Sequence, residues 1–234
     1  MALPFFFEEH LSANPSFNLN EDTSRHVIQV LRMHTGEQLK LTNGNGQLLT
    51  VEIVTTVKRS AGVKLLSTSS LPNRSNKIII AISLLKSESR FEWFLEKVTE
   101  IGVTEIIPVI CERTEKQHFR HERMKKIMIS AMLQSQQVWL PTLHSPGTFN
   151  DVILRAGYHQ KFIAHCNDSE TKLLQDVVNK NNGDKIILIG PEGDFTMKEI
   201  AVSKENNFLE VSLGNTRLRA ETAGIYSAVI LGTR

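Results

Sequence analysis

The stretch Lys185–Thr196, which reads KIILIGPEGDFT, indicates how the larger part of the chain folds. After its leading lysine it runs through four apolar residues to Gly190, and Thr196 has capping-box spacing to Glu199. An apolar strand without polar alternation, followed by a glycine turn and a helix start, is typical of a strand buried on both faces of a parallel sheet. The stretch therefore predicts one strand–turn–helix unit of an α/β domain.

The same alternation continues on both sides of this stretch. Apolar strands are predicted at 77–84, 105–110, 161–165, 185–189 and 209–212, and helices at 90–101, 122–134, 169–179, 197–206 and 220–231. We expect Ser89 and Glu92 to form a capping box at the first of these helices. Taken together, the pattern predicts a parallel sheet covered by helices on both faces.

The N-terminal residues 1–70 follow a different pattern. Strands are predicted at 38–42, 47–55 and 61–67, and a short helix at 24–33. The turn Asn43-Gly44-Asn45-Gly46 predicts a hairpin, because Asn and Gly tolerate positive φ. Short strands, tight turns and one helix predict a small β-barrel over 1–70. The segment 67–76 is poor in apolar residues and reads as a linker to a second domain over 73–234.

Two details of the short N-terminal helix follow from the same reading. We expect Thr23 or Ser24 to cap its N-terminus. The helical spacing places Val27, Val30 and Leu31 on the face that points inward.

Composition excludes several classes of protein. Of the 234 residues 41% are hydrophobic and 22% charged, and the net charge is +2, which is ordinary for a globular protein. The longest strongly apolar run, 78–85, is far shorter than the ~20 residues that cross a bilayer. The N-terminus has no early basic residue of the kind found in secretory signals. Cys111 and Cys166 form neither a CxxC pair nor a disulfide framework, so we expect a reduced, cytoplasmic setting.

Basic residues gather between positions 113 and 126. The members are Arg113, Lys116, Arg120, Arg123, Lys125 and Lys126, against Glu115 and Glu122. One interpretation is a phosphate-binding surface, because clustered cations release counterions from nucleic acid. The other is the solvated face of a helix, and charge alone does not separate the two. His118 and His121 lie in the same stretch, where the neighbouring cations disfavour a metal ion.

Three predicted strand ends carry a candidate binding site. In an open α/β sheet, ligands bind beyond the carboxyl ends of the strands, and here these ends lead into the loops 165–167, 190–194 and 213–218. Glycines in two of these loops serve either close approach of the backbone to a ligand or turns alone. The chain has no GxGxxG, GxxxxGK[ST], HExxH or GxSxG motif, which disfavours dinucleotide, P-loop, zinc and serine-hydrolase chemistry.

The two glycine loops, taken in order, resemble those of a known family. Gly190-Pro191-Glu192-Gly193, followed by Leu213-Gly214 and Leu218-Arg219-Ala220-Glu221-Thr222-Ala223, resembles the RsmE-type 16S rRNA (uracil-N3) methyltransferases of the SPOUT class. Further similar segments are His26 with Val30-Leu31-Arg32-Met33, Lys97 with Glu100-Ile101-Gly102-Val103, and Cys111-Glu112-Arg113. The resemblance therefore covers the whole chain.

The chain departs from the family pattern at three places. Asp194 stands where the family has a second glycine, and Asn215-Thr216 where it has Pro-Arg. The family's E-Q-S-G-R segment reads Leu133-Gln134-Ser135-Gln136-Gln137 here, without the acid and the arginine. This last departure puts in doubt any substrate contact assigned to that segment.

The resemblance implies a fold and a reaction. The fold is an N-terminal PUA-like β-barrel that binds RNA, joined to a C-terminal SPOUT α/β domain with a trefoil knot, usually in a homodimer. The reaction is methyl transfer from S-adenosylmethionine to N3 of a uridine in the decoding region of 16S rRNA, without a metal. A non-catalytic RNA-binding or ribosome-assembly factor on the same scaffold is the alternative. An unrelated nucleotide-binding enzyme with an α/β core is a third possibility.

The resemblance and the loops together assign residues to roles. We expect the cofactor to be bound by His165, Ile189, Gly190, Pro191, Glu192, Gly193, Leu213, Gly214, Leu218, Thr222 and Ala223, and RNA by Arg32, Arg113, Lys116, Arg120, Arg123 and Lys126. Arg219 is the expected catalytic cation, which stabilises the charge that forms when N3 loses its proton or grips a phosphate. Glu221, the second expected catalytic residue, accepts that proton, orients Arg219 or offsets the dipole of its helix.

Overall fold

The sheet in the larger part of the chain is parallel, as its apolar strands predicted. A computed structural model gives the structure, and it describes residues 3–57, 59–155, 157–166, 171–179 and 183–232. The strand order is β11-β13-β10-β12-β6-β7-β8, with β9 also paired to β7, and these pairs are parallel. The strands are β6 (Ile78–Ser83), β7 (Glu105–Ile110), β8 (Thr142–Leu143), β9 (Gly147–Thr148), β10 (Gln160–Ala164), β11 (Lys172–Leu173), β12 (Lys185–Ile189) and β13 (Leu209–Ser212).

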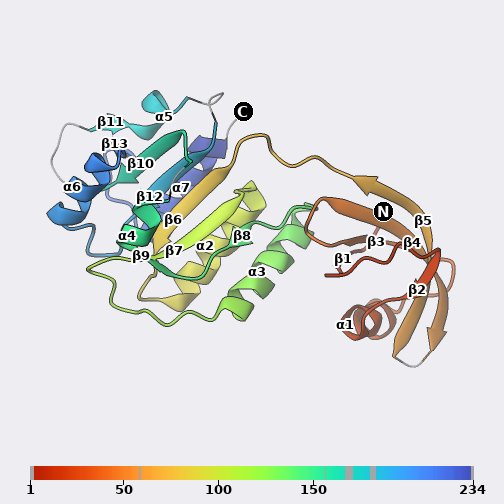
Figure 1. Cartoon of the computed structure of the whole chain (residues 1–234). Helices are drawn as coiled ribbons and strands as arrows, with labels where there is room; N and C mark the ends of the chain where they lie inside the picture. Colours follow the sequence, from red (N-terminus) through yellow and green to blue (C-terminus); the bar gives the residue numbers. More distant parts are fainter. Residues whose placement is uncertain (1–2, 58, 156, 167–170, 180–182, 233–234) are drawn as a thin grey trace. The chain divides into compact units, whose positions relative to one another are not determined.

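Helices cover both faces of this sheet (Figure 1). They are α2 (Glu88–Ile101), α3 (His121–Gln134), α4 (Phe149–Ile153), α5 (Leu174–Val177), α6 (Met197–Glu205) and α7 (Ala220–Gly232). On β6, Ile79 belongs to a core cluster with Phe149 of α4 and Ile200 of α6. The neighbouring Ile82 lies against Gly224 of α7, a helix that also packs on α2. Because both faces are buried, these strands carry no polar alternation.

The chain forms two compact units. The first comprises Met1–Asn73 with Met132–Leu140, and the second comprises Arg74–Ala131 with Pro141–Arg234. The first unit holds a five-stranded sheet in the order β1-β3-β4-β5-β2. Its elements are β1 (Phe5–Phe7), β2 (Ser16–Asn18), α1 (Glu21–Arg25), the π-helix η1 (His26–Val30), β3 (Gln38–Thr42), β4 (Gln47–Val57) and β5 (Ser60–Ser70).

A separate core holds the first unit together. It includes Leu39, Leu41, Val51 and Val63, which point to the same side of the sheet. The segment Met132–Leu140 joins this unit through backbone bonds, for example from the N–H of Gly46 to the carbonyl of Val138 at 2.9 Å. The predicted hairpin is confirmed, since β3 and β4 pair antiparallel across Asn43–Gly46.

The N-terminal helix prediction is wrong in its bounds and in its exposed face. α1 begins at Glu21 because Asn20, not Thr23 or Ser24, caps it by accepting the N–H of Thr23 at 2.8 Å. The helix then continues as the π-helix η1, which changes the direction of the side chains. Val27 stays buried, but Val30 and Leu31 are exposed.

Three further expectations are corrected in this fold. α2 begins at Glu88 after Ser87, and the capping box of Ser89 with Glu92 is absent because Glu92 pairs with Arg123. The expected helix 169–179 is reduced to α5, preceded by the short strand β11; residues 169 and 170 lie outside the described residues. The expected linker from residue 67 starts later, because β5 continues to Ser70. By contrast, the capping box of Thr196 with Glu199 is confirmed at α6.

Within the described ranges, every helix is too short or too polar to cross a membrane.

Candidate active site

The three predicted loops meet at one edge of the parallel sheet. Their strands are neighbours in the order β13-β10-β12, so their carboxyl ends lie side by side. A cavity of about 690 Å³ opens there, within the size range of small-molecule sites. Its lining is Arg90, Ala164, His165, Cys166, Thr171, Ile189, Gly190, Pro191, Glu192, Asp194, Ser212, Leu213, Gly214, Asn215, Thr216, Arg217, Leu218, Arg219, Ala220 and Ala223.

Most of the residues expected to bind a cofactor line this cavity. These are His165, Ile189, Gly190, Pro191, Glu192, Leu213, Gly214, Leu218 and Ala223. Gly193 and Thr222 are not part of the lining formed by the described residues. The carbonyl of Gly193 instead accepts a bond from Arg113 at 2.7 Å. Asn167, also in a predicted loop, lies outside the described residues.

His165 lines the cavity through its backbone rather than its ring. Its side chain is only 1% exposed and contacts Glu210 of β13, with 3.1 Å between Nε2 and Oε1. Lys204 of α6 holds the other oxygen of Glu210 at 2.7 Å. The hydrogen bond from Lys204, assisted by His165, keeps the pKa of Glu210 below its ordinary value despite the opposing effect of burial. The His165 ring therefore anchors β10 to β13 beneath the cavity.

The conformation and hydrogen bonds of Asp194 explain why this residue can stand where the family has a glycine. Its φ is +63°, in the left-handed region that Asp tolerates better than most residues. One carboxylate oxygen accepts the N–H of Cys166 and the other accepts the N–H of Phe195, each at 2.8 Å. The aspartate therefore keeps a backbone shape suited to glycine and adds a link between two loops of the cavity.

The glycines of the loops serve different purposes. At Gly190 an added Cβ would come within 3.1 Å of the buried Phe195 ring, so this glycine allows close packing in the core. Gly214 has a φ of +130° and open space around the position of a Cβ, so it is needed for backbone conformation. The sequence left close approach and turn formation open, and the structure shows tight packing at one glycine and a special turn at the other.

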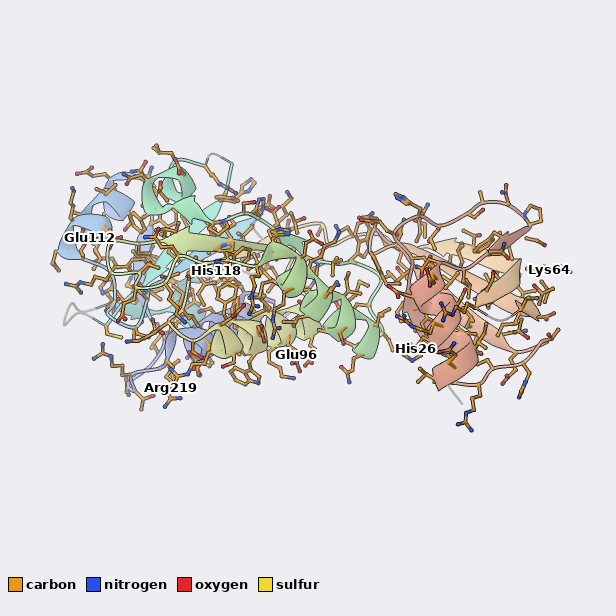
Figure 2. All side chains as sticks on the ribbon, turned by 90° about the horizontal axis from the view of Figure 1, so that it is seen from below. His26, Lys64, Glu96, Glu112, His118 and Arg219 are labelled. Carbon is orange, nitrogen blue, oxygen red and sulfur yellow. The ribbon has the colours of Figure 1, made fainter. Side chains whose placement is uncertain are left out.

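Arg219 and Glu221 are separated by the entry into α7. Arg219 lines the cavity just before the helix begins, and Figure 2 shows it on the segment that leads into α7. Glu221 is buried in the first turn and does not belong to the lining. Its carboxylate lies 3.8 Å from the Nε of Arg90, a residue that the sequence analysis missed. The signal that could have found Arg90 is its place in the first turn of α2, directly after the strand end of β6.

Two arginines of the basic stretch are ion-paired within the second unit. Arg120 binds both carboxylate oxygens of Glu88, at 2.8 and 2.5 Å, and Arg123 binds both oxygens of Glu92. The hydrogen bond from Arg120 lowers the pKa of Glu88 and the same bond raises the pKa of Arg120. These pairs join α2 to the start of α3 and leave less positive charge on this surface.

The remaining residues expected to bind RNA are exposed. Lys116 and Lys126 belong to the second unit, and Arg32 to the first, directly after η1. Arg32 has a φ of +54°, so it ends the helical turn. Among the residues that the structure describes, no group of three or more His, Cys, Asp or Glu side chains is arranged to hold a metal ion.

Comparison with known proteins agrees with this architecture. Residues 72–232 match the RNA methyltransferase domain family and residues 19–66 match the RNA methyltransferase PUA domain family. The "Ribosomal RNA small subunit methyltransferase E" of Rickettsia conorii is 27% identical over 222 residues, which cover 94% of this chain and 91% of the relative.

Two solved structures share the fold over nearly the full length. A probable rRNA-methyltransferase from Porphyromonas gingivalis superposes with a TM-score of 0.90 and 32% identity, covering 97% of this chain and 95% of that one. The ribosomal RNA small subunit methyltransferase E from Neisseria gonorrhoeae, bound to S-adenosyl methionine, has a TM-score of 0.86 and 27% identity with the same coverage. The chain, which joins a PUA domain to an RNA methyltransferase domain, therefore belongs to the ribosomal RNA small subunit methyltransferase E family.

Proposed function

We propose that this protein transfers the methyl group of S-adenosylmethionine to N3 of a uridine in the decoding region of 16S rRNA. The observation that carries the proposal is the cavity at the carboxyl edge of the sheet, with Arg219 in its lining, in a chain of this RNA methyltransferase family. The family resemblance of the loops supports the choice of uracil N3.

The methyl donor is S-adenosylmethionine, as in the Neisseria gonorrhoeae structure. The residues present fit it: the cavity has the volume of a nucleoside-sized site, and the three loops that line it can offer backbone N–H and C=O groups to an adenine. When bound, the cofactor supplies a sulfonium methyl group that is already activated for displacement. The task of the protein is therefore positioning more than activation.

The residues around the cavity account for the acceptor side of the reaction. Uracil N3 carries a weakly acidic proton, and its loss spreads negative charge over N3 and the flanking carbonyl oxygens. Arg219 is placed to stabilise that charge. Glu221 is buried and outside the lining, which favours a supporting role over proton acceptance. Because N3 lies on the Watson–Crick edge, the target uridine must be unpaired or flipped out.

The RNA around the target needs further contacts. We propose that Arg32 of the first unit, with Arg113, Lys116, Arg120, Arg123 and Lys126, contacts RNA phosphates. We expect Lys116 and Lys126 to contribute more to RNA binding than Arg120 and Arg123, because these two arginines are ion-paired.

We also propose that the protein acts as a homodimer. The helices α2 and α7 pack on each other and leave Trp93, Tyr226 and Val229 exposed. Exposed large apolar side chains on adjoining helices suit a self-complementary interface. Sedimentation velocity is the direct test, and Tyr226→Glu with Val229→Glu should shift a dimer toward monomer.

The decisive test of the function is nucleoside mass spectrometry on small-subunit rRNA from a strain that lacks this protein. We expect 3-methyluridine to disappear and to return with the wild-type gene, but not with Arg219→Ala. Calorimetry with S-adenosylhomocysteine tests the alternative of a non-catalytic assembly factor, because loss of cofactor binding would support it; such a factor would also leave 3-methyluridine unchanged in the deletion strain. An unchanged 3-methyluridine content would overturn the proposal.

A further inference from the structure

Arg90 adds a guanidinium to the cavity lining from a segment far in the sequence from Arg217 and Arg219, which also line it. It belongs to the first turn of α2 and lines the cavity together with Arg219, which precedes α7. Its side chain is 42% exposed, so a ligand from solution can reach it. Guanidiniums from two separate segments of the chain therefore line the same cavity.

Glu221 holds this arginine in place. Its carboxylate is only 7% exposed, and a buried carboxylate requires a charged or hydrogen-bonding partner. Among the described residues, Arg90 is the cation within ion-pair distance, at 3.8 Å from Nε to Oε1. Because α2 and α7 pack on each other, the pair connects the first turns of two helices at the cavity.

The geometry of the pair leaves donors for a ligand. Nε lies 3.8 Å from Oε1 of Glu221, an ion-pair distance longer than a hydrogen bond, and a guanidinium has five N–H donors with which to bind the oxygen acceptors of a ligand. A planar guanidinium matches the oxygens of a phosphate better than an ammonium does. The exposure of Arg90 suits a ligand that arrives with the RNA, whereas the loop backbone suits the cofactor.

We propose that Arg90 binds a backbone phosphate next to the target nucleotide, and that Glu221 is the positioning residue that orients it. The inference rests on the proposed function, since it supposes that an RNA nucleotide enters this cavity. It separates the two arginines by role: Arg90 contributes to RNA binding in the ground state, and Arg219 contributes to the chemical step.

The test compares Arg90→Ala, Arg90→Lys, Glu221→Gln and the double variant Arg90→Ala/Glu221→Gln with the wild-type protein. Lys198→Ala is the matched control, because it removes an exposed cation of the same unit that does not line the cavity. The probe is a transcript of the 16S rRNA decoding region, and its affinity is measured at several KCl concentrations. A mixed-sequence RNA of equal length serves as a second probe.

We expect Arg90→Ala to flatten the log–log salt dependence by roughly 0.7–0.9 for both RNAs, the value of one phosphate contact. The single-turnover rate at saturating RNA should stay within about threefold of wild type, because a ground-state contact changes affinity rather than kcat. Lysine at position 90 should restore the salt dependence in part. Glu221→Gln should weaken RNA affinity, and the double variant should be no weaker than Arg90→Ala, since the two residues act as one pair.

Two outcomes would overturn the inference. If Arg90→Ala leaves both the salt dependence and the rate at saturating RNA equal to those of wild type and Lys198→Ala, Arg90 has a structural role only. If the rate at saturating RNA falls while the salt dependence is unchanged, Arg90 contacts the base instead. The salt dependence comes from binding measurements alone and does not require methylation. Failure of the wild-type protein to methylate the transcript would therefore refute the proposed function, while the role of Arg90 in RNA binding would still be decided by the salt dependence.

Discussion

Asp194 ties two loops of the cavity together, because its Oδ2 accepts the backbone N–H of Cys166 at 2.8 Å. The link joins the loop after β12 to the loop after β10, and both loops line the cavity. Its other oxygen stabilises its own turn through the N–H of Phe195. With an acid at this position the chain gains a contact between two loops, whereas a glycine would give a more flexible backbone without that contact.

This link predicts the effect of Asp194→Gly. Glycine keeps the left-handed backbone but removes the acceptor, so the exposed Cys166 N–H loses its partner at a cost of about 0.5–1.5 kcal/mol. We expect S-adenosylmethionine affinity, measured by calorimetry, to fall about tenfold, with little change in kcat at saturating cofactor. Asp194→Asn keeps one acceptor and tolerates the same φ, so its loss should be intermediate. Wild-type affinity in Asp194→Gly would contradict the role of the link.

Gly214 provides a test of the third loop. At a φ of +130°, Gly214→Val is strained by about 1–3 kcal/mol, and it meets no atom within 4 Å that would disturb the core. We expect the variant to stay folded and to lose most of its cofactor affinity, because the reshaped loop lines the cavity.

Gly157→Val is the control for Gly214→Val. Gly157 has a φ of +102° and equally open surroundings, in the same unit but outside the cavity lining. Both variants should lose similar thermal stability, and only Gly214→Val should lose cofactor binding. Equal affinities in the two variants would remove the third loop from the cofactor site.

Arg219→Ala should lower the rate of the chemical step. Removing a cation that stabilises developing charge typically costs on the order of a hundredfold in kcat. Arg219→Lys should recover part of the loss, because an ammonium lacks the planar fork. Single-turnover methylation at saturating S-adenosylmethionine and saturating RNA measures this directly. Near-normal turnover of Arg219→Ala would refute the catalytic role, and a loss of the same size in Glu221→Gln would make Glu221 the general base.

The cations of the basic stretch should differ in how much they contribute to RNA binding, because some of them are ion-paired. We expect Lys116→Ala with Lys126→Ala to flatten the salt dependence of RNA binding by roughly 0.7–0.9 per lost contact. Arg120→Ala should change it less, since Glu88 already compensates that charge. Cofactor affinity should be unchanged in both proteins. An unaltered salt dependence in the lysine variant would identify the stretch as a solvated helix face.

Glu105 should stabilise the fold by an amount that depends on pH. Burial opposes ionisation of this side chain, but hydrogen bonds from Lys77 at 2.7 Å and His144 at 3.0 Å hold its pKa below the ordinary value. A carboxyl whose pKa is lower in the folded state stabilises the fold above its unfolded pKa, and the effect is lost as pH falls through the folded pKa. Glu105→Gln should therefore reduce the free energy of unfolding by about 1 kcal/mol at neutral pH.

Urea unfolding of wild type and Glu105→Gln at several pH values checks this prediction. The difference between the two proteins should be largest above pH 4.5, the ordinary pKa, and should shrink at lower pH. A difference that is constant across pH would mean that packing, not charge, stabilises this position.

The sequence by itself determined the α/β class of the larger part of the chain and most of its longer strands and helices. The strands predicted at 38–42, 105–110, 185–189 and 209–212 have these same bounds in the structure. The turn of Asn43–Gly46 and the Thr196 capping box are also present as predicted. These features depend on residues that are close in the sequence: the side-chain period sets the strands, the φ preference sets the turn, and capping sets the start of the helix. The linear sequence therefore contains the information that predicts them. The trefoil knot stays a prediction from the family resemblance.

Only the tertiary structure decided which distant residues meet. The order β13-β10-β12 brings together loops far apart in the chain, and the Arg90–Glu221 pair joins the starts of two helices. In the folded chain the buried His165 ring contacts Glu210, and Arg120 forms an ion pair with Glu88. Such contacts are set by packing and by the pairing of buried charges across long sequence separations. No local periodicity encodes them, which is why the sequence predicted which loops line the cavity but not the contacts that shape it.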